Sequence, residues 1–80
     1  MENLTLGEKR VRTTFNPDDN SVVQHAKERA AEFINFIDVE INAPENTPKE
    51  NLGEFIRLKS LAMTAIEEAA MWAVKAATFK

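Results

Sequence analysis

Residues 60–80 read SLAMTAIEEAAMWAVKAATFK, and this stretch decides the fold of the chain. It contains seven alanines, no glycine and no proline. Alanine, methionine, glutamate and lysine have the highest intrinsic helix propensities, so the stretch predicts a helix. Its one large aromatic residue near the centre is Trp72.

Apolar residues surround most of this predicted helix. One side carries apolar residues at spacings of three and four, and a second line passes through Trp72 and Phe79. A helix that is apolar on most sides must be buried on more than one side. A single partner helix in an 80-residue chain cannot cover that surface, so the sequence predicts self-association. The predicted oligomer core comprises Ile66, Ala69, Trp72, Ala73 and Ala76.

The sequence upstream predicts a second helix and a turn. Asn16 suits an N-cap, Pro17 the first helical position, and the two aspartates that follow suit the helix dipole, so a helix is expected over residues 17–42. Its apolar stripe is expected at Val22, Ala26, Ala30, Phe33, Ile37 and Ile41. Residues 47–50, TPKE, have the form of a capping box and predict that the long helix spans residues 47–79.

The segment before the first helix has a different pattern. Residues 1–8 are polar without a period and are expected to be flexible. In residues 9–16 Val11, Thr13 and Phe15 alternate with polar neighbours, which favours an extended arm along a helix surface. The predicted fold class is all-α: one domain, residues 1–80, forming an antiparallel two-helix hairpin with an extended N-terminal arm, assembled into a compact helical homo-oligomer.

Composition excludes several classes of function. The chain has no cysteine and a net charge of −3, which argues against a zinc-thiolate site and against general DNA binding. No apolar run approaches the ~20 residues of a membrane span, so a soluble protein without membrane contact is expected. The sequence lacks a Ser-His-Asp set, metal-ligand spacing and a phosphate-binding glycine loop. We therefore expect no enzymatic activity, no cofactor and no metal.

Charge is unevenly distributed along the chain. Residues 31–56 hold six acids against Lys49 alone, whereas bases gather toward both ends. One hypothesis is an acidic helical module that binds and inhibits a host protein, in which case small ligands would not raise the melting temperature. The acids of this patch are Glu32, Asp38, Glu40, Glu45, Glu50 and Glu54.

A second hypothesis is a binding site at the open end of the hairpin. There Phe15 precedes the first helix among basic residues that include Arg12 and Lys27. Bases and a helix end suit an anion, and a flat aromatic ring suits a stacked nucleobase. The same residues are also compatible with a hydrophobic staple at Phe15 and ordinary solubilising charge.

The order of several motifs resembles the phage anti-CBASS nucleotide-sponge family. The motifs are residues 12–17 (RTTFNP), 25–27 (HAK), 60–64 (SLAMT) and 66–73 (IEEAAMWA). The hairpin also resembles the helical part of phage sponges that counter Thoeris defence. The resemblance covers residues 11–79 and implies a non-enzymatic phage anti-defence protein, acting in the host cytoplasm, that sequesters cyclic oligonucleotides such as 3′,3′-cGAMP.

The resemblance also implies an assembly and sites. Family members are hexamers, with cyclic dinucleotides held between two protomers by an aromatic residue that stacks on a base and a basic residue that meets the phosphates. Here those positions are Phe15 and Lys27, with Arg12 and Asn16 beside them. Cyclic trinucleotides occupy a separate site in some members, and its candidates here are Arg57, Lys59 and Thr64. The chain departs from the family pattern at Phe15 (usually Tyr), Asn16 (commonly His) and Val74 (often Asn).

Overall fold

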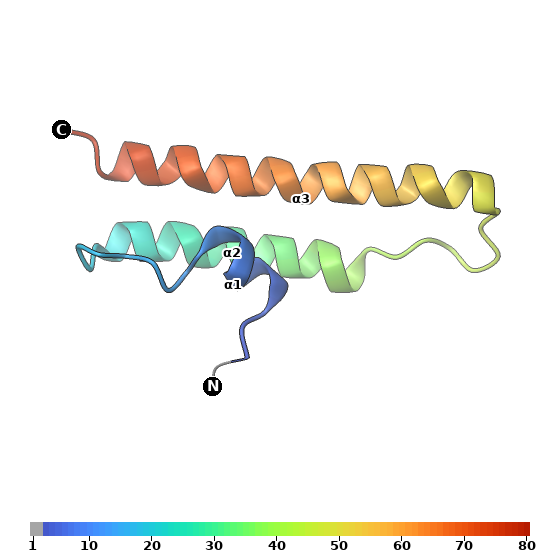
Figure 1. Cartoon of the computed structure of the whole chain (residues 1–80), viewed down its shortest axis with the longest axis horizontal. Coiled ribbons are helices and arrows are strands. Elements are labelled where there is room, and N and C mark those ends of the chain that lie inside the picture. The colour runs from blue at the N-terminus through green and yellow to red at the C-terminus, as the bar shows by residue number, and fades with distance from the viewer. Residues whose placement is uncertain (1–2) are drawn as a thin grey trace.

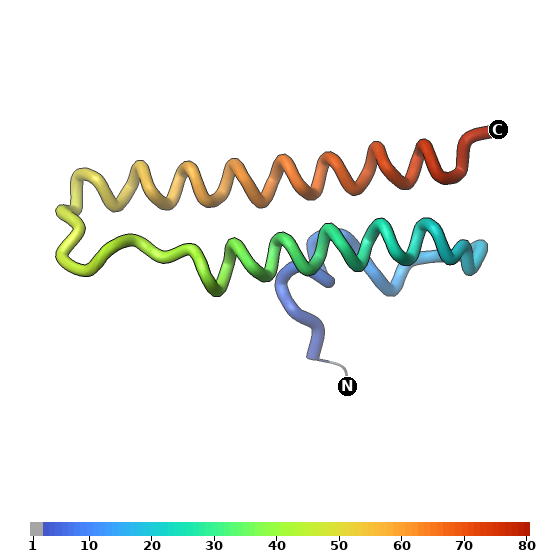
Figure 2. The backbone as a smooth tube through the Cα atoms, turned by 180° about the vertical axis from the view of Figure 1, so that it is seen from behind, coloured from blue at the N-terminus to red at the C-terminus, as the bar shows by residue number. Residues whose placement is uncertain are grey.

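The computed structural model describes residues 3–80, and this range contains three helices and no strand. They are α1 (Leu6–Val11), α2 (Ser21–Glu40) and α3 (Lys49–Ala77). In Figure 1 α2 and α3 lie side by side along the long axis, and the chain reverses direction through residues 41–48. The view from behind in Figure 2 shows the same two rods, with the N-terminal segment lying against α2. The all-α class is confirmed.

Helix α2 begins later than predicted. Residues 17–19 form a turn rather than the first helical turn, and the N-cap is Asn20, whose side chain accepts hydrogen bonds from the backbone N–H groups of Val22 and Val23. Asn16 instead braces the turn: its Nδ2 donates to the carbonyl of Asn20 at 2.8 Å. An N-cap side chain bonds the free N–H groups of the residues two and three positions after it. Asn20 is the residue at that position before α2. The helix ends at Glu40, short of residue 42.

Helix α3 also begins without the predicted capping box. Its N-cap is Pro48, with no side-chain cap, because the Thr47 hydroxyl donates back to the carbonyl of Pro44. The helix runs 29 residues to Ala77, two residues short of the predicted end. Gly53 lies inside it without breaking it.

The prediction for the N-terminal segment is wrong. Residues 6–11 form a helix, so residues 9–16 are not an extended arm, and only Met1 and Glu2 of the predicted flexible segment lie outside the described residues. A capping box holds the helix start, with Thr5 and Glu8 exchanging side-chain-to-backbone bonds. Docking on α2 supplies the rest: the backbone N–H of Gly7 donates to Asn35 Oδ1 at 2.8 Å.

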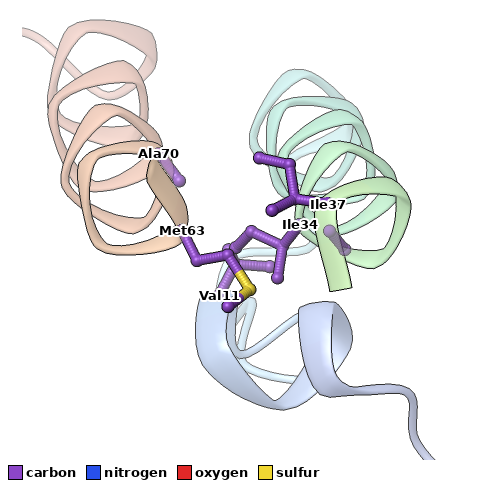
Figure 3. Close-up of a cluster of buried hydrophobic side chains, with 6 residues drawn as sticks. Val11, Ile34, Ile37, Met63 and Ala70 are labelled. Atoms are coloured by element: carbon purple, nitrogen blue, oxygen red, sulfur yellow. The ribbon is translucent and has the colours of Figure 1, made fainter. Parts of the chain in front are cut away.

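The core is small and lies where the three helices meet. Figure 3 shows Val11 of α1, Ile34 and Ile37 of α2, and Met63 of α3 pointing into the same space. The buried side of α2 carries Val23, Lys27, Ala31, Ile34 and Ile37. The predicted stripe, which Val23, Ile34 and Phe36 were expected to widen, shares Val23, Ile34 and Ile37 with this side. Lys27 and Ala31 were not predicted to be buried, and they are buried because α1 and the turn that follows it pack there. The predicted stripe residues Ala26, Ala30 and Phe33 line a shallow groove against α3.

Replacement of the two glycines by alanine should have opposite effects on stability. A Cβ at Gly7 would overlap the backbone carbonyl of Ala31, so Gly7→Ala must push α1 away from α2. We expect it to lower the free energy of unfolding by about 1–3 kcal/mol, as overpacking does. A Cβ at Gly53 meets nothing within 4 Å, so Gly53→Ala should raise it by about 1 kcal/mol through helix propensity.

Urea denaturation of the three proteins at one concentration measures the difference. Equal stability of the two variants would show that α1 does not pack closely on α2.

Candidate functional site

A cavity of about 670 Å³ opens between α3 and the segment that joins α1 to α2. One wall is the end of α1 with Arg12 and Phe15, and the other wall is a single face of α3. The cavity is lined by Arg10, Val11, Arg12, Phe15, Lys27, Thr64, Glu67, Glu68, Ala70, Met71, Val74 and Lys75. The structure therefore brings together three of the four residues predicted for a cyclic-dinucleotide site: Arg12, Phe15 and Lys27.

Phe15 is the aromatic residue that lines this cavity, and 53% of its surface is exposed. Two cations lie over its ring: the guanidinium carbon of Arg12 is 4.7 Å from the ring centroid, and the ammonium of Lys27 is 5.3 Å away. Both distances are within the range of cation–π attraction. Arg12 reaches this position because it ends α1 in the left-handed conformation, at φ 57°, and so turns the chain toward Phe15. Phe15 is thus a half-exposed aromatic residue with two cations fixed beside its ring.

Lys27 fixes the positions of Arg12 and Phe15 through hydrogen bonds to their backbone carbonyls. It is only 7% exposed, and its ammonium donates to the carbonyl of Arg12 at 3.1 Å and to the carbonyl of Phe15. Burial, and then the guanidinium of Arg12, lower the pKa of Lys27. A buried charge is costly unless it is hydrogen-bonded, and the two carbonyls offset that cost. Lys27 therefore anchors the turn that presents Phe15, and one N–H of its ammonium has no partner among residues 3–80.

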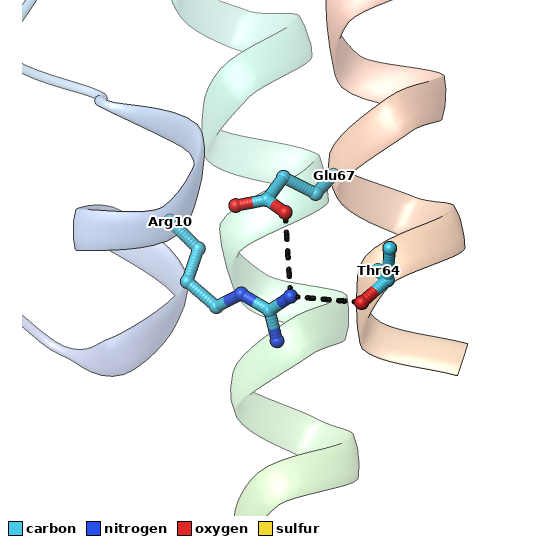
Figure 4. Close-up of polar contacts among 3 residues, drawn as sticks. All are labelled: Arg10, Thr64 and Glu67. Carbon is cyan, nitrogen blue, oxygen red and sulfur yellow. Dashed lines mark hydrogen bonds and ion pairs between the residues drawn. The ribbon is translucent and has the colours of Figure 1, made fainter. Parts of the chain in front are cut away.

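Arg10 ties the two walls of the cavity together. In Figure 4 its guanidinium reaches from α1 to α3, where Nη2 donates to Thr64 Oγ1 at 3.2 Å and to Glu67 Oε1 at 3.3 Å. The ion pair is partly shielded, since the Arg10 side chain is 23% exposed and that of Glu67 41%. Thr64, predicted for a trinucleotide site, thus lies in the same cavity as Phe15.

Comparison with protein families decides what this hairpin is. The sequence model of the Acb2/Tad1 hairpin domain matches residues 8–78, nearly the whole chain. The chain belongs to the Acb2/Tad1 hairpin family. This family comprises anti-CBASS and anti-Thoeris sponges, which bind small molecules rather than catalyse reactions. Neither the curated proteins nor the solved structures compared with this chain include a match.

The other predicted site residues of this Acb2/Tad1 chain lie outside the cavity. Asn16 adjoins Phe15 in the chain, but its side-chain amide is engaged with Asn20 and Gln24. Arg57 forms two hydrogen bonds with Glu54, at 2.8 and 2.9 Å, and these lower the pKa of Glu54. Lys59 Nζ donates to the carbonyl of Asp38. Within one chain, therefore, Arg57 and Lys59 are not gathered with Thr64.

Four of the five predicted oligomer-core residues are exposed in the single chain, whereas Ile66 is partly buried against its core. Ile66, Ala69 and Ala73 line the groove of about 450 Å³ between α2 and α3. Trp72 is 60% exposed, and Ala76 is exposed as well. Their coverage by other copies of the chain stays a prediction.

Sequence reasoning did not assign Glu67, Glu68 or Met71 to the site. Together with Thr64 they fall at spacings of three, four and seven, which is one face of a helix. That pattern was visible in the sequence, but the wall opposite it could not be placed without α1. Among residues 3–80 no group of acidic or histidine side chains could hold a metal ion, and no helix in that range is long and apolar enough to span a membrane.

Removal of the Lys27 ammonium should release the turn that carries Phe15. Lys27→Met keeps the length of the side chain and its apolar stem but loses both bonds to the carbonyls of Arg12 and Phe15. We expect faster amide hydrogen exchange in residues 13–16, with unchanged protection in the middle of α2, measured by mass spectrometry.

The matched control is Arg29→Met on the same helix, where the exposed arginine forms one ion pair within residues 3–80, with Glu32 at 3.9 Å. Unchanged exchange in residues 13–16 of Lys27→Met would contradict the anchoring role.

Proposed function

We propose that this protein is a non-enzymatic sponge that binds cyclic di- and trinucleotide second messengers, such as 3′,3′-cGAMP, and withholds them from CBASS effectors in the cytoplasm of a phage-infected host. One observation carries the proposal: an exposed Phe15 ring, flanked by two cations, forms a wall of a cavity of about 670 Å³. That volume lies within the range of small-molecule sites. Membership of a sponge family supports the same reading.

The chemistry of the cavity suits a nucleotide that carries phosphates. A nucleobase stacks on the ring of Phe15, and such stacking contributes about 1–3 kcal/mol per base. The phosphates meet positive charge: the Arg12 guanidinium, which hydrogen-bonds phosphate in a planar fork, and the remaining N–H of Lys27. Lys75 on α3 adds a third cation at the opposite wall. Lys27 then has two roles, since it anchors the turn and faces the ligand.

The shape of the chain supports assembly into an oligomer. Its radius of gyration is 15.0 Å, and it measures 49 × 31 × 14 Å, whereas a compact chain of this length has a radius of gyration of about 12 Å. Large apolar side chains that include Phe33, Phe36 and Trp72 are more than half exposed. We propose that copies of the chain cover these faces in a homohexamer, and that each cavity is completed at a contact between protomers.

A trinucleotide site would then require more than one protomer. Arg57 and Lys59 lie on α3 two and one turns before Thr64 and carry exposed or partly exposed side chains. Side chains from neighbouring copies could converge where α3 helices meet. The trinucleotide site therefore depends on the proposed assembly, whereas the residues of the dinucleotide site already lie together in one chain.

Phe15→Ala should remove the stacking surface. We expect it to weaken binding of 3′,3′-cGAMP by about 1–3 kcal/mol, which isothermal titration calorimetry measures directly. Phe55→Ala is a matched control, because Phe55 also lies beneath a lysine, with Lys59 Nζ 5.8 Å from its ring, but outside the cavity. Unaltered affinity in Phe15→Ala, with the mass of the assembly unchanged, would remove Phe15 from the site.

Ala73→Glu should disrupt the assembly. Ala73 lines the groove between α2 and α3, where a glutamate would occupy the space that a second chain needs and would have to lose its water. Light scattering after size exclusion should show a shift toward the 9.0 kDa of one chain. Ser60→Glu, on an exposed position of α3 outside the groove, should keep the wild-type mass. An unchanged mass in Ala73→Glu would place the protomer contacts elsewhere.

A further inference from the structure

The cavity holds two adjacent carboxylates, which is unexpected for a site that receives an anionic ligand. Glu67 and Glu68 both line it on the α3 wall, opposite Phe15. Glu67 is neutralised by the Arg10 guanidinium at 3.3 Å. Glu68 has no ion pair or hydrogen bond with any of residues 3–80. A carboxylate is an acceptor only, so facing a phosphate it would weaken binding.

The position of Glu68 indicates what it faces instead. A base stacked on Phe15 presents its face to the ring and its edge to the surrounding walls, one of which is α3. On that helix Glu68 lies one turn after Thr64, which Arg10 holds, and one turn before Met71, so it stands in the middle of the wall. The phosphates are drawn toward Arg12 and Lys27 on the other wall and toward Lys75, which lies about 10 Å beyond Glu68 along α3. Glu68 is therefore placed for the base and not for the backbone.

Of guanine and adenine, only guanine has an edge that can donate two hydrogen bonds to one carboxylate. Its Watson–Crick edge carries N1–H and N2–H side by side, and the two oxygens of a carboxylate match this pair. Adenine carries one donor, N6–H, next to the N1 lone pair, which a carboxylate repels. We propose that Glu68 selects guanine-containing cyclic dinucleotides by accepting hydrogen bonds from this edge, an inference that rests on the proposed function.

The test compares two ligands that differ only in their bases, cyclic di-GMP and cyclic di-AMP. Isothermal titration of the wild-type protein should give tighter binding of cyclic di-GMP by about five-fold or more, as a bidentate base contact provides. In Glu68→Gln this ratio should fall to about one, because an amide offers one donor and one acceptor and pairs as well with N6–H and N1 of adenine as with N1–H and O6 of guanine.

The ratio separates base selection from general electrostatics, since loss of one negative charge strengthens binding of both anions equally. Glu50→Gln removes the same charge from the start of α3, about 27 Å along the helix from Glu68, and should keep the wild-type ratio. Equal affinities in the wild type, or an unchanged ratio in Glu68→Gln, would overturn the inference and leave the sponge function intact. Binding of neither ligand to the wild type would overturn this inference, and a further lack of binding to 3′,3′-cGAMP would overturn the proposed function with it.

Discussion

Helix α3 has more apolar surface than one chain can cover, and the rest of the molecule follows from that constraint. Of its 29 residues only Met63 and Ala70 are buried, although alanine and larger apolar residues occur on nearly every side. Helix α2 covers one side and the short α1 helix a second. The chain is consequently a slab 14 Å thick rather than a globule. Free apolar faces of this extent are typical of surfaces that bind other molecules.

The same helix borders both the open apolar groove and the cavity. The face with Ile66, Ala69 and Ala73 borders the groove, while the neighbouring face with Glu67, Glu68 and Lys75 borders the cavity. Across the cavity, α1 and its connecting turn are fixed by two polar links, Arg10 to α3 and Lys27 to the turn carbonyls. A ligand that enters meets groups already in place. Preorganisation of this kind reduces the ordering cost of binding, which a stoichiometric sponge needs because it has no turnover.

The sequence was sufficient for the parts of the fold that local chemistry determines. The helix class and the approximate extents of α2 and α3 follow from propensity, proline placement and apolar spacing. The proximity of Arg12, Phe15 and Lys27 followed from the reversal of the chain together with family resemblance. The start of α2 was misplaced because Asn16 and Asn20 are both able caps, and only the turn geometry at residues 17–19 assigns that role to Asn20.

What could not be predicted depends on contacts between segments distant in the chain. The Thr5–Glu8 capping box is readable in the sequence, but Gly7 argues against a helix of six residues unless close packing on Ala31 requires a glycine. Because α1 was missed, Ala31 was left out of the predicted buried side of α2, and Lys27 was read as a free cation. Its burial follows only from the two carbonyls that α1 and its turn bring to it. Native mass spectrometry of the wild-type chain with 3′,3′-cGAMP tests the central claim most directly. The account predicts a multiple of 9.0 kDa that carries bound ligand, and a ligand-free species at 9.0 kDa would contradict it.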